Sequence, residues 1–174
     1  MFNDQQRPTD KLNLLSGGDN AGKAKDNVAK LTEMMEFAPL GWSTDAQYDK
    51  GKILLDQRYQ HIAETEPKLL EPLMAHERVH AKHQSGNPTD EASLKVYVDE
   101  ELEAYHAQHD TWQAIKDDYE LNYRAPEMQR ALGEAWPELH AQYTFLENEV
   151  EKVGWDGVRE NLEWQYRRRM ELNQ

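Results

Sequence analysis

Apolar residues recur three and four positions apart along most of the chain, which is the spacing that places side chains on one face of an α-helix. The pattern predicts helices over residues 21–37, from residue 67 or 72 to about 84, from 91 to about 123, and again after Pro126. Pro67 and Pro72 both suit a first helical turn, because proline has no N–H to offer the helix interior. The Ser-Gly-Asn-Pro cluster at residues 85–88 ends the first long helix, and Thr89 or Asp90 caps the next.

A different pattern occupies the region before these helices. Residues 52–56, Lys-Ile-Leu-Leu-Asp, form a short apolar run that directly follows the turn-forming sequence Asp49-Lys50-Gly51. A turn signal next to such a run is typical of a β-hairpin. We therefore expect a hairpin near residues 40–60 whose second strand is residues 52–56.

These elements predict an α+β fold that is mostly helical, with a small sheet or hairpin near residues 40–60 packed on the helix that follows it. Residues 1–20 are polar and contain Pro8 and the pair Gly17-Gly18, so we expect a flexible N-terminal arm. Residues 21–174 are expected to form a single domain with a helical C-terminal region at about 115–174. Within that region, Pro137 is expected to kink or split a helix, and Gly154 and Gly157 to break it again.

Composition narrows the range of partners. The chain of 174 residues has 20 Lys and Arg against 33 Asp and Glu, a formal net charge of −13. Nucleic acids and anionic membranes both attract basic surfaces, so neither is an expected partner. No apolar stretch reaches the 18 or more residues of a membrane span, and the N-terminus lacks the apolar core of a signal peptide. We expect a cytoplasmic protein, or one delivered by a route that needs no signal peptide.

Candidate chemistry lies on the first long helix. Residues 76–80, His-Glu-Arg-Val-His, match the pattern H-E-x-x-H. Positions four apart lie on one helix face, roughly 6 Å apart along the axis, so His76 and His80 can converge on one Zn²⁺ ion. Glu77 then lies beside the ion and can take a proton from the attacking water. Leu69 and Leu73 share the face of the two histidines, which predicts that this face is turned inward.

A catalytic zinc site needs a third protein ligand and one open position. The chain has no cysteine, so the ligand must be His, Asp or Glu. The next helix offers an acidic run, in which Glu101 is the first choice and Glu103 and Glu100 are alternatives. The break at residues 85–88 allows this helix to turn back against the first.

Residues 52–110 resemble the gluzincin family of zinc metallopeptidases. The resemblance rests on His76-Glu77-x-x-His80, followed about twenty residues later by Glu101-x-x-Ala104. It implies a zincin-like fold, one zinc ion held by His76, His80 and Glu101, and a strand upstream of the active-site helix whose edge holds extended substrate. Ala104 fits the small residue that lets the two helices approach closely. Many members have Asp or Asn where this chain has Tyr105.

The function predicted from these features is hydrolysis of a peptide bond, with a protein or peptide as substrate, Glu77 as the general base and Tyr105 as the first choice for stabilising the oxyanion. Tyr97, His83, His106 and His109 are further candidates for that last role. Two alternatives remain open. One is a toxin or effector with the same chemistry, and the other is a non-catalytic helical interaction protein in which zinc is structural or absent.

Overall fold

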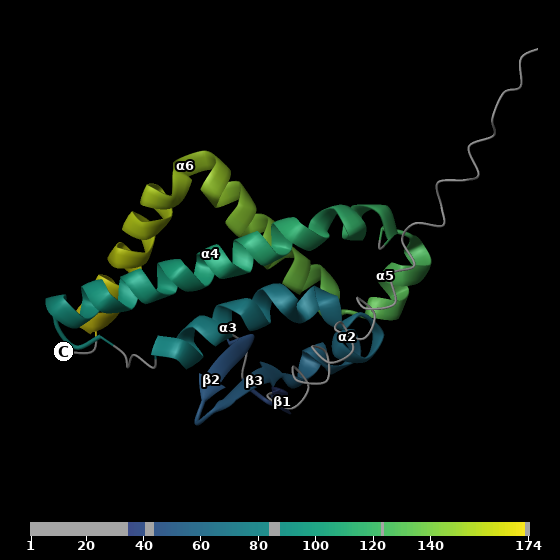
Figure 1. The fold of residues 1–174 in the computed structure, drawn as a ribbon, viewed down its shortest axis with the longest axis horizontal. Helices are drawn as coiled ribbons and strands as arrows, with labels where there is room; N and C mark the ends of the chain where they lie inside the picture. The colour runs from purple at the N-terminus through teal and green to yellow at the C-terminus, as the bar shows by residue number, and fades with distance from the viewer. Residues whose placement is uncertain (1–34, 41–43, 84–87, 123, 173–174) are drawn as a thin grey trace, which may run out of the picture. The chain divides into compact units, whose positions relative to one another are not determined.

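A computed structural model of the chain describes residues 35–40, 44–83, 88–122 and 124–172. Residues 36–174 form one compact unit, and the description below concerns that unit. Its fold is mostly helical with one small sheet, as the sequence predicts (Figure 1). The elements are β1 (Met35–Ala38), β2 (Ala46–Asp49), β3 (Lys52–Asp56), the 3₁₀ helix η2 (Gln57–Tyr59), α2 (Gln60–Thr65), the 3₁₀ helix η3 (Pro67–Leu70), α3 (Glu71–His83), α4 (Glu91–Asn122), α5 (Pro126–Leu132) and α6 (Ala135–Leu172).

The sheet has three strands in the order β1-β3-β2. The predicted hairpin is confirmed, since β2 pairs antiparallel with β3 and a two-residue turn, Lys50-Gly51, joins them. Both turn residues have positive φ, 46° and 90°, which is the geometry of a tight hairpin turn and explains the glycine. The helix predicted over residues 21–37 is wrong at its end, where Met35–Ala38 form a strand. Residues 21–34 of that prediction, and the predicted arm at 1–20, lie outside the described residues.

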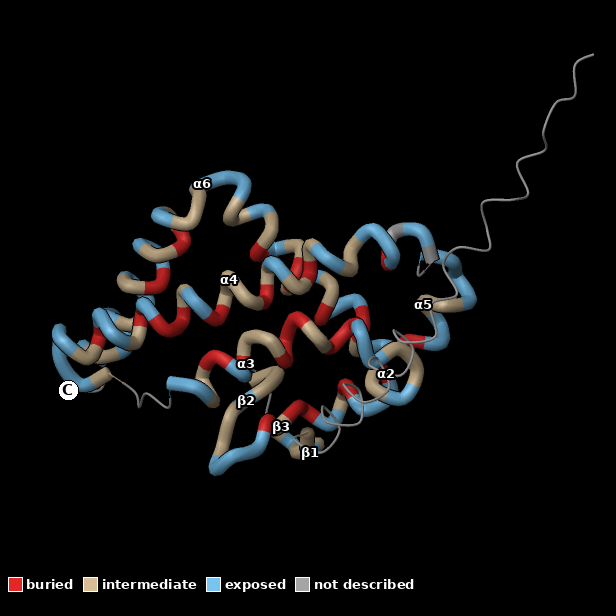
Figure 2. Tube along the Cα trace, in the orientation of Figure 1, coloured by how far each residue is buried: buried red, intermediate tan, exposed pale blue. Residues whose placement is uncertain are grey.

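Helices α3 and α4 form the main packing layer of the unit and run in opposite directions side by side (Figure 1). Their buried stretches face each other (Figure 2). Glu71 begins α3 one residue before Pro72, and Asp90 caps α4 by accepting a hydrogen bond from the Ser93 N–H at 2.7 Å. Ile53 and Leu55 of β3 are buried completely, and both hairpin strands pack on α3. The predicted order of sheet, first helix and reversed second helix is thus confirmed.

The last helix, α6, has one sharp interruption. Gly154 has φ 68° and ψ 175°, so α6 consists of two arms that meet at this residue, as the bend in Figure 1 shows. Gly157, which was also expected to break the helix, lies inside the second arm. The helical stretch after Pro126 is split, as expected, because α5 ends at Leu132 and α6 begins at Ala135; Pro137 falls in the first turn of α6, where its missing N–H costs nothing.

Each arm of α6 packs on a different part of α4. The first arm contributes Trp136 and Tyr143 to an aromatic cluster with Trp112 and Tyr119 of α4. The buried indole of Trp136 donates to the Tyr119 hydroxyl at 3.1 Å. The second arm packs through two buried residues, Val158 and Leu162, against Leu94 and Val98 near the start of α4. The bend at Gly154 therefore lets one continuous segment cover both ends of α4.

A polar cluster connects the hairpin to α6. The carboxylate of Asp45, next to β2, accepts hydrogen bonds from the Arg58 guanidinium, the Tyr59 hydroxyl and, at 2.8 Å, the Gln142 side chain. Arg58 also reaches Glu138 in the first turn of α6 at 3.2 Å. These contacts hold the start of β2 against the first arm of α6.

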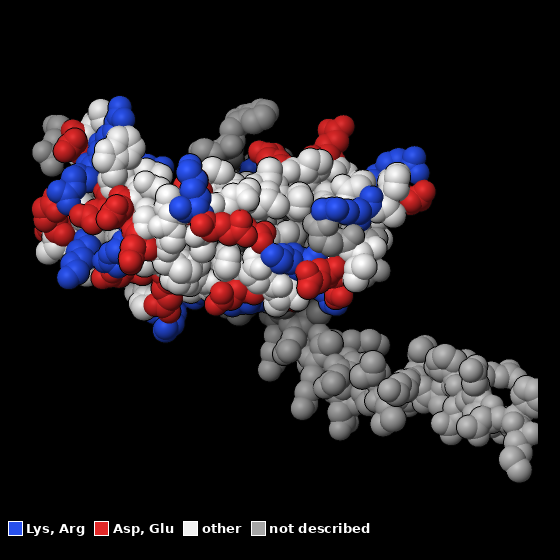
Figure 3. Space-filling view, turned by 90° about the horizontal axis from the view of Figure 1, so that it is seen from above, with Lys and Arg blue, Asp and Glu red and all other residues white. Residues whose placement is uncertain are grey.

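The surface charge agrees with the acidic composition. Acidic and basic side chains alternate over the face shown in Figure 3, with no continuous basic area on that face. In the part of the chain that the structure describes, no helix combines the length and the apolar character needed to cross a membrane.

The backbone at Gly154 generates a first prediction. Its angles belong to a region that only glycine occupies without strain, although no atom lies within 4 Å of where a Cβ would be. Replacing Gly154 with Ala should therefore lower the free energy of unfolding by about 1–3 kcal/mol through backbone strain alone. Urea denaturation measures this, with Asn148→Ala, at an exposed helical position of the first arm, as the control. Equal stability of the two variants would show that the bend does not require glycine.

A second prediction concerns pH. Glu147 of α6 accepts a hydrogen bond from the indole N–H of Trp112 at 3.2 Å and pairs with Lys116. Partial burial raises the pKa of Glu147, but the hydrogen bonds from Lys116, Gln113 and Trp112 outweigh it, so the pKa is lowered below 4.5. A carboxyl whose pKa is lower in the folded state stabilises the fold above the unfolded pKa and loses this effect as the pH falls through the folded pKa.

Glu147→Gln should accordingly cost roughly 1 kcal/mol of stability at pH 7, and this cost should shrink as the pH is lowered below about 4. Denaturant unfolding of the variant and the parent at several pH values gives the difference directly. Glu160→Gln, an exposed change on the same helix, is the control. A cost that stays constant with pH would mean that the charge of Glu147 is not what matters.

Candidate metal centre

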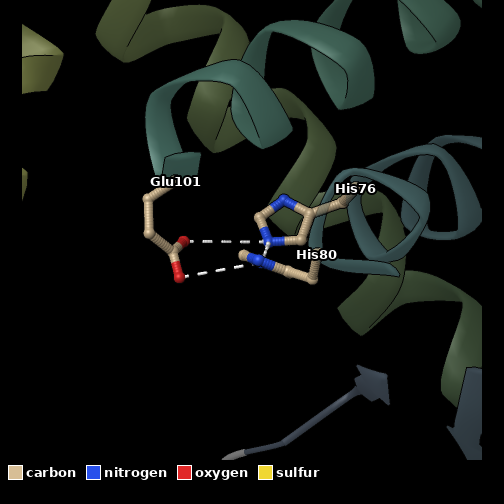
Figure 4. Close-up of side chains that lie close together, drawn as sticks. All are labelled: His76, His80 and Glu101. Carbon is tan, nitrogen blue, oxygen red and sulfur yellow. Dashed lines mark hydrogen bonds and ion pairs between the residues drawn. The ribbon is translucent and has the colours of Figure 1, made fainter. Parts of the chain in front are cut away.

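The two histidines of α3 and a glutamate of α4 converge in the seam between the helices. His76 and His80 lie one turn apart on α3, and Glu101 faces them from α4 (Figure 4). The Nε2 atoms of His76 and His80 are 3.2 Å apart. The carboxylate oxygens of Glu101 lie 3.8 Å from Nε2 of His76 and 3.7 Å from Nε2 of His80. Three ligand atoms from two helices thus surround one small volume.

These distances fit a small divalent cation. Zinc bonds of 2.0–2.2 Å in tetrahedral geometry place neighbouring ligand atoms about 3.3–3.6 Å apart. The Nε2–Nε2 separation of 3.2 Å is close to that range, and the two N–O separations, each to a different oxygen of Glu101, are 3.7 and 3.8 Å. Two imidazole nitrogens and one carboxylate oxygen also match the donor set of hydrolytic zinc sites. Within the described ranges no fourth His, Asp or Glu joins the group, so one position is left for another ligand.

The three candidates for the third ligand, Glu100, Glu101 and Glu103, lie in different surroundings. Glu101 is the one whose carboxylate faces both imidazoles. Glu103 is directed to the surface, where it binds Lys82 at 2.9 Å and His83 at 3.0 Å. Glu100 is buried and its carboxylate lies 2.8 Å from Nδ1 of His80, on the opposite side of that ring from the cluster.

The contact between the Glu100 carboxylate and Nδ1 of His80 sets the tautomer and the orientation of the His80 ring. A carboxylate at Nδ1 keeps the proton on that nitrogen and leaves Nε2 with a free lone pair directed at the cluster. It also fixes the orientation of the ring. Glu100 therefore performs the orienting role that many histidine metal ligands obtain from a second carboxylate.

Burial, and not a neighbouring carboxylate, keeps the imidazole of His76 in the form that can bind a cation. Burial and the neighbouring His80 lower the pKa of His76 to about 3, so its imidazole is neutral at neutral pH, the form that binds a cation. Gln108, a buried residue of α4, lies next to this ring and raises the pKa slightly, but Nδ1 of His76 has no partner at hydrogen-bond distance among the described residues. The ring of Tyr105 packs edge-on against the ring of His76, with centroids 4.9 Å apart.

Glu77 lies beside the cluster and does not belong to it. Its side chain is buried, and burial raises the pKa of Glu77 to about 7 against the opposing effects of His80 and of a hydrogen bond from the backbone N–H of Tyr48. Tyr48 belongs to β2, so this hydrogen bond connects α3 to the hairpin. A carboxyl with a pKa near 7 can both accept and release a proton at neutral pH.

The C-terminal arm of α6 supplies a part of the site that sequence reasoning missed. Tyr166 packs against Tyr97 of α4, with ring centroids 4.7 Å apart and an interplanar angle of 72°. The hydroxyl groups of both tyrosines approach the carboxylate of Glu101, and burial raises the pKa of both. The apolar pattern at Val158 and Leu162 indicated that this helix is amphipathic, but nothing in the sequence indicated that it packs on α4 beside Glu101.

The three converging residues, Glu77 and the tyrosines at 97, 105 and 166 line one cleft of about 1280 Å³, whereas Glu100 does not. One wall is β2 with its turn, and the other walls come from α3, α4 and both arms of α6. The expectation that residues 52–56 provide the substrate-facing edge is wrong, because β3 is the central strand and β2 is the strand at the edge that faces the cleft. The difference arises because β1 covers the other side of β3.

The remaining histidines lie elsewhere. His106 stacks on Trp155 with ring centroids 3.5 Å apart, and His109 contacts the same indole edge-on. His140 packs among the aromatic residues of the core, His61 lies next to Gly133, and His83 pairs with Glu103. Tyr105 and Tyr97 are thus the only earlier candidates for stabilising an oxyanion that line the cleft in the described part of the chain.

The position of Glu100 leads to a third prediction. Replacing it with Gln keeps the size of the side chain but removes the negative charge that orients His80, so the affinity for Zn²⁺ should fall about 10–100-fold. Competition with a chelating dye measures this affinity without reference to any activity. The matched control is Glu103→Gln, three positions along the same helix, which should bind as the parent does. Equal affinity of the Glu100 variant and the parent would rule out the orienting role.

No family model, curated protein or solved structure matches this chain. The interpretation of this cluster as a metal centre therefore depends on the residues and the geometry of the chain itself.

Proposed function

We propose that the protein is a zinc-dependent metallopeptidase with a gluzincin-like site. The observation that carries this proposal is the placement of Glu77. It lies next to three converging ligand atoms, is not one of them, and has a pKa near 7 in a cleft wide enough for a peptide. A cluster that only stabilises the fold needs no such carboxyl and has no reason to open into a cleft.

In the proposed mechanism, His76, His80 and Glu101 would hold one Zn²⁺ ion. When bound there, the ion would supply Lewis acidity for the scissile carbonyl and the attacking water. Glu77 accepts the proton of that water and later donates it to the leaving amine. Glu100 keeps Nε2 of His80 available, and the aromatic side chains of Tyr97, Tyr105 and Tyr166 limit access of bulk water to this side of the cluster.

The substrate is proposed to bind as an extended chain along β2. This strand is at the edge of the sheet and lines the cleft beside Glu77. An edge strand presents backbone N–H and C=O groups that an extended peptide can pair with, and such pairing does not depend on the peptide's side chains. The Asp45 cluster supports this role because it holds the start of β2 in place against α6.

The roles of Zn²⁺ and Glu77 can be tested together. The zinc-loaded protein is expected to cleave peptides in a denatured protein digest, with new termini identified by mass spectrometry. Glu77→Gln should bind Zn²⁺ in equal stoichiometry but lose cleavage by at least about 100-fold, because the general base contributes 10²–10⁴-fold in rate. Glu103→Gln is the control for an acidic residue near the site that takes no part, and should cleave normally.

Two results would contradict the proposal. One is a parent protein that binds no Zn²⁺ when metal is supplied in excess. The other is cleavage that persists unchanged in the Glu77 variant, since this would assign the activity to a contaminant or to other residues.

A further inference from the structure

We propose that Arg169 binds a carboxylate group of the peptide substrate, so that the enzyme prefers peptides carrying a carboxylate at a fixed distance from the scissile bond. The inference rests on the proposed peptidase function and adds the class of substrate. It is carried by the position of Arg169 in the cleft and by the absence of any acidic partner for it in the described chain.

Arg169 reaches the cleft from the second arm of α6. It lines the same cavity as the metal cluster, and its guanidinium carbon lies 5.1 Å from the ring centroid of Tyr166. Burial raises the pKa of Tyr105, and the positive charge of Arg169 opposes this effect, so the guanidinium lies near that hydroxyl as well. An arginine packed on an aromatic ring is held in place while its N–H groups remain free to donate.

The three consecutive arginines at 167–169 differ in their partners. Arg167 binds Glu91 at 3.0 Å and Glu163 at 2.8 Å. Arg168 lies over the exposed ring of Trp164 and does not line the cleft. Arg169 has no carboxylate within 4.0 Å among the residues that the structure describes, although the chain carries a large excess of acidic residues. Only one of the three is thus left both unpaired and facing the site.

Three other acidic side chains of the cleft have a cationic side chain within 4.0 Å. Asp45 pairs with Arg58, Asp49 with Lys50 at 4.0 Å, and Glu149 with Lys152 at 4.0 Å. Glu101 faces the two imidazoles and is the proposed metal ligand. Two cationic side chains line the cleft, Lys50 and Arg169, and only Arg169 has no carboxylate within 4.0 Å among the described residues. A carboxylate is the anionic group that a peptide offers, and it accepts two parallel hydrogen bonds from a guanidinium.

Arg169 is not placed to stabilise the reacting carbonyl itself. Its guanidinium carbon lies 5.1 Å from the ring centroid of Tyr166, whereas it is the hydroxyl of that tyrosine that approaches Glu101, and Arg169 is not among the three residues that converge in the cluster. The carboxylate that Arg169 binds is consequently separated from the scissile bond. It belongs either to an acidic side chain of the peptide or to its C-terminus.

Cleavage-site profiling distinguishes these two sources. The zinc-loaded full-length protein is incubated with a proteome-derived peptide library, and with the same library after amidation of every carboxyl terminus. We expect enrichment of Asp and Glu at one position relative to the cut, or cuts at a fixed distance from the C-terminus that disappear on amidation. Arg169→Gln should reduce this preference about 10- to 100-fold, whereas cleavage of peptides without the carboxylate continues.

Two further variants sharpen the test. Arg169→Lys should restore part of the preference, because lysine keeps the charge but not the paired hydrogen bonds. Arg168→Gln, one residue away and outside the cleft, should leave the profile unchanged. Glu77-dependent cleavage with no carboxylate preference, or a preference that survives in Arg169→Gln, would overturn this inference and leave the proposed function intact. Absence of Glu77-dependent cleavage in the parent would instead overturn both.

Discussion

The close packing of α3 on α4 is the constraint on which the site depends, because the seam between these helices contains buried ionisable groups. Four of the buried polar side chains, Glu77, Glu100, Glu101 and Gln108, lie here, together with the mostly buried His76. Burying a carboxylate costs several kcal/mol unless it is paired or protonated. Glu100 is paired with His80. Burial raises the pKa of Glu77, so that the neutral form of its carboxyl is more favoured than in water.

The carboxylate of Glu101 is approached by the hydroxyl groups of Tyr97 and Tyr166, but it pairs with no Lys or Arg among the described residues. Its nearest described cationic candidates are the two imidazoles at 3.7 and 3.8 Å, and His76 is held neutral by its own burial. A divalent cation between the three groups would neutralise the carboxylate and use both nitrogen lone pairs. Burial of these groups would therefore favour metal binding in the proposed site, and this would link the stability of the α3–α4 pair to the proposed chemistry.

The convergence of His76, His80 and Glu101 could be predicted from the sequence because it depends on regular periodicity. Positions 76 and 80 share a face of any helix, and the breaker cluster at 85–88 left a reversed second helix as the simple solution. The hairpin was predictable for the same reason, since Lys50-Gly51 sets the turn geometry locally. Strand β1 was missed because Met34 and Met35 continue the helical spacing of residues 28–35, and pairing with β3 decides the conformation of Met35–Ala38.

What could not be predicted depends on contacts between distant segments. Tyr166 and Arg169 reach the cleft only because Gly154 bends α6 and because Val158 and Leu162 then pack on the start of α4. A helical pattern shows which face of the second arm is apolar, but not which partner that face meets. Two of the cleft's functional candidates therefore come from a region that carries no recognisable motif.

Tyr105 stands where the chain differs from the gluzincin pattern that its motif resembles, although a carboxylate still orients one of the two histidines. Where the family has Asp or Asn after the small residue, Tyr105 offers a ring that packs on His76 and no carboxylate. The acidic group that orients a histidine is found instead at Glu100, directly before the proposed ligand Glu101, and it acts on His80. Adjacent residues on a helix point about 100° apart. One of the pair can thus face the shared volume while the other reaches around the ring to Nδ1.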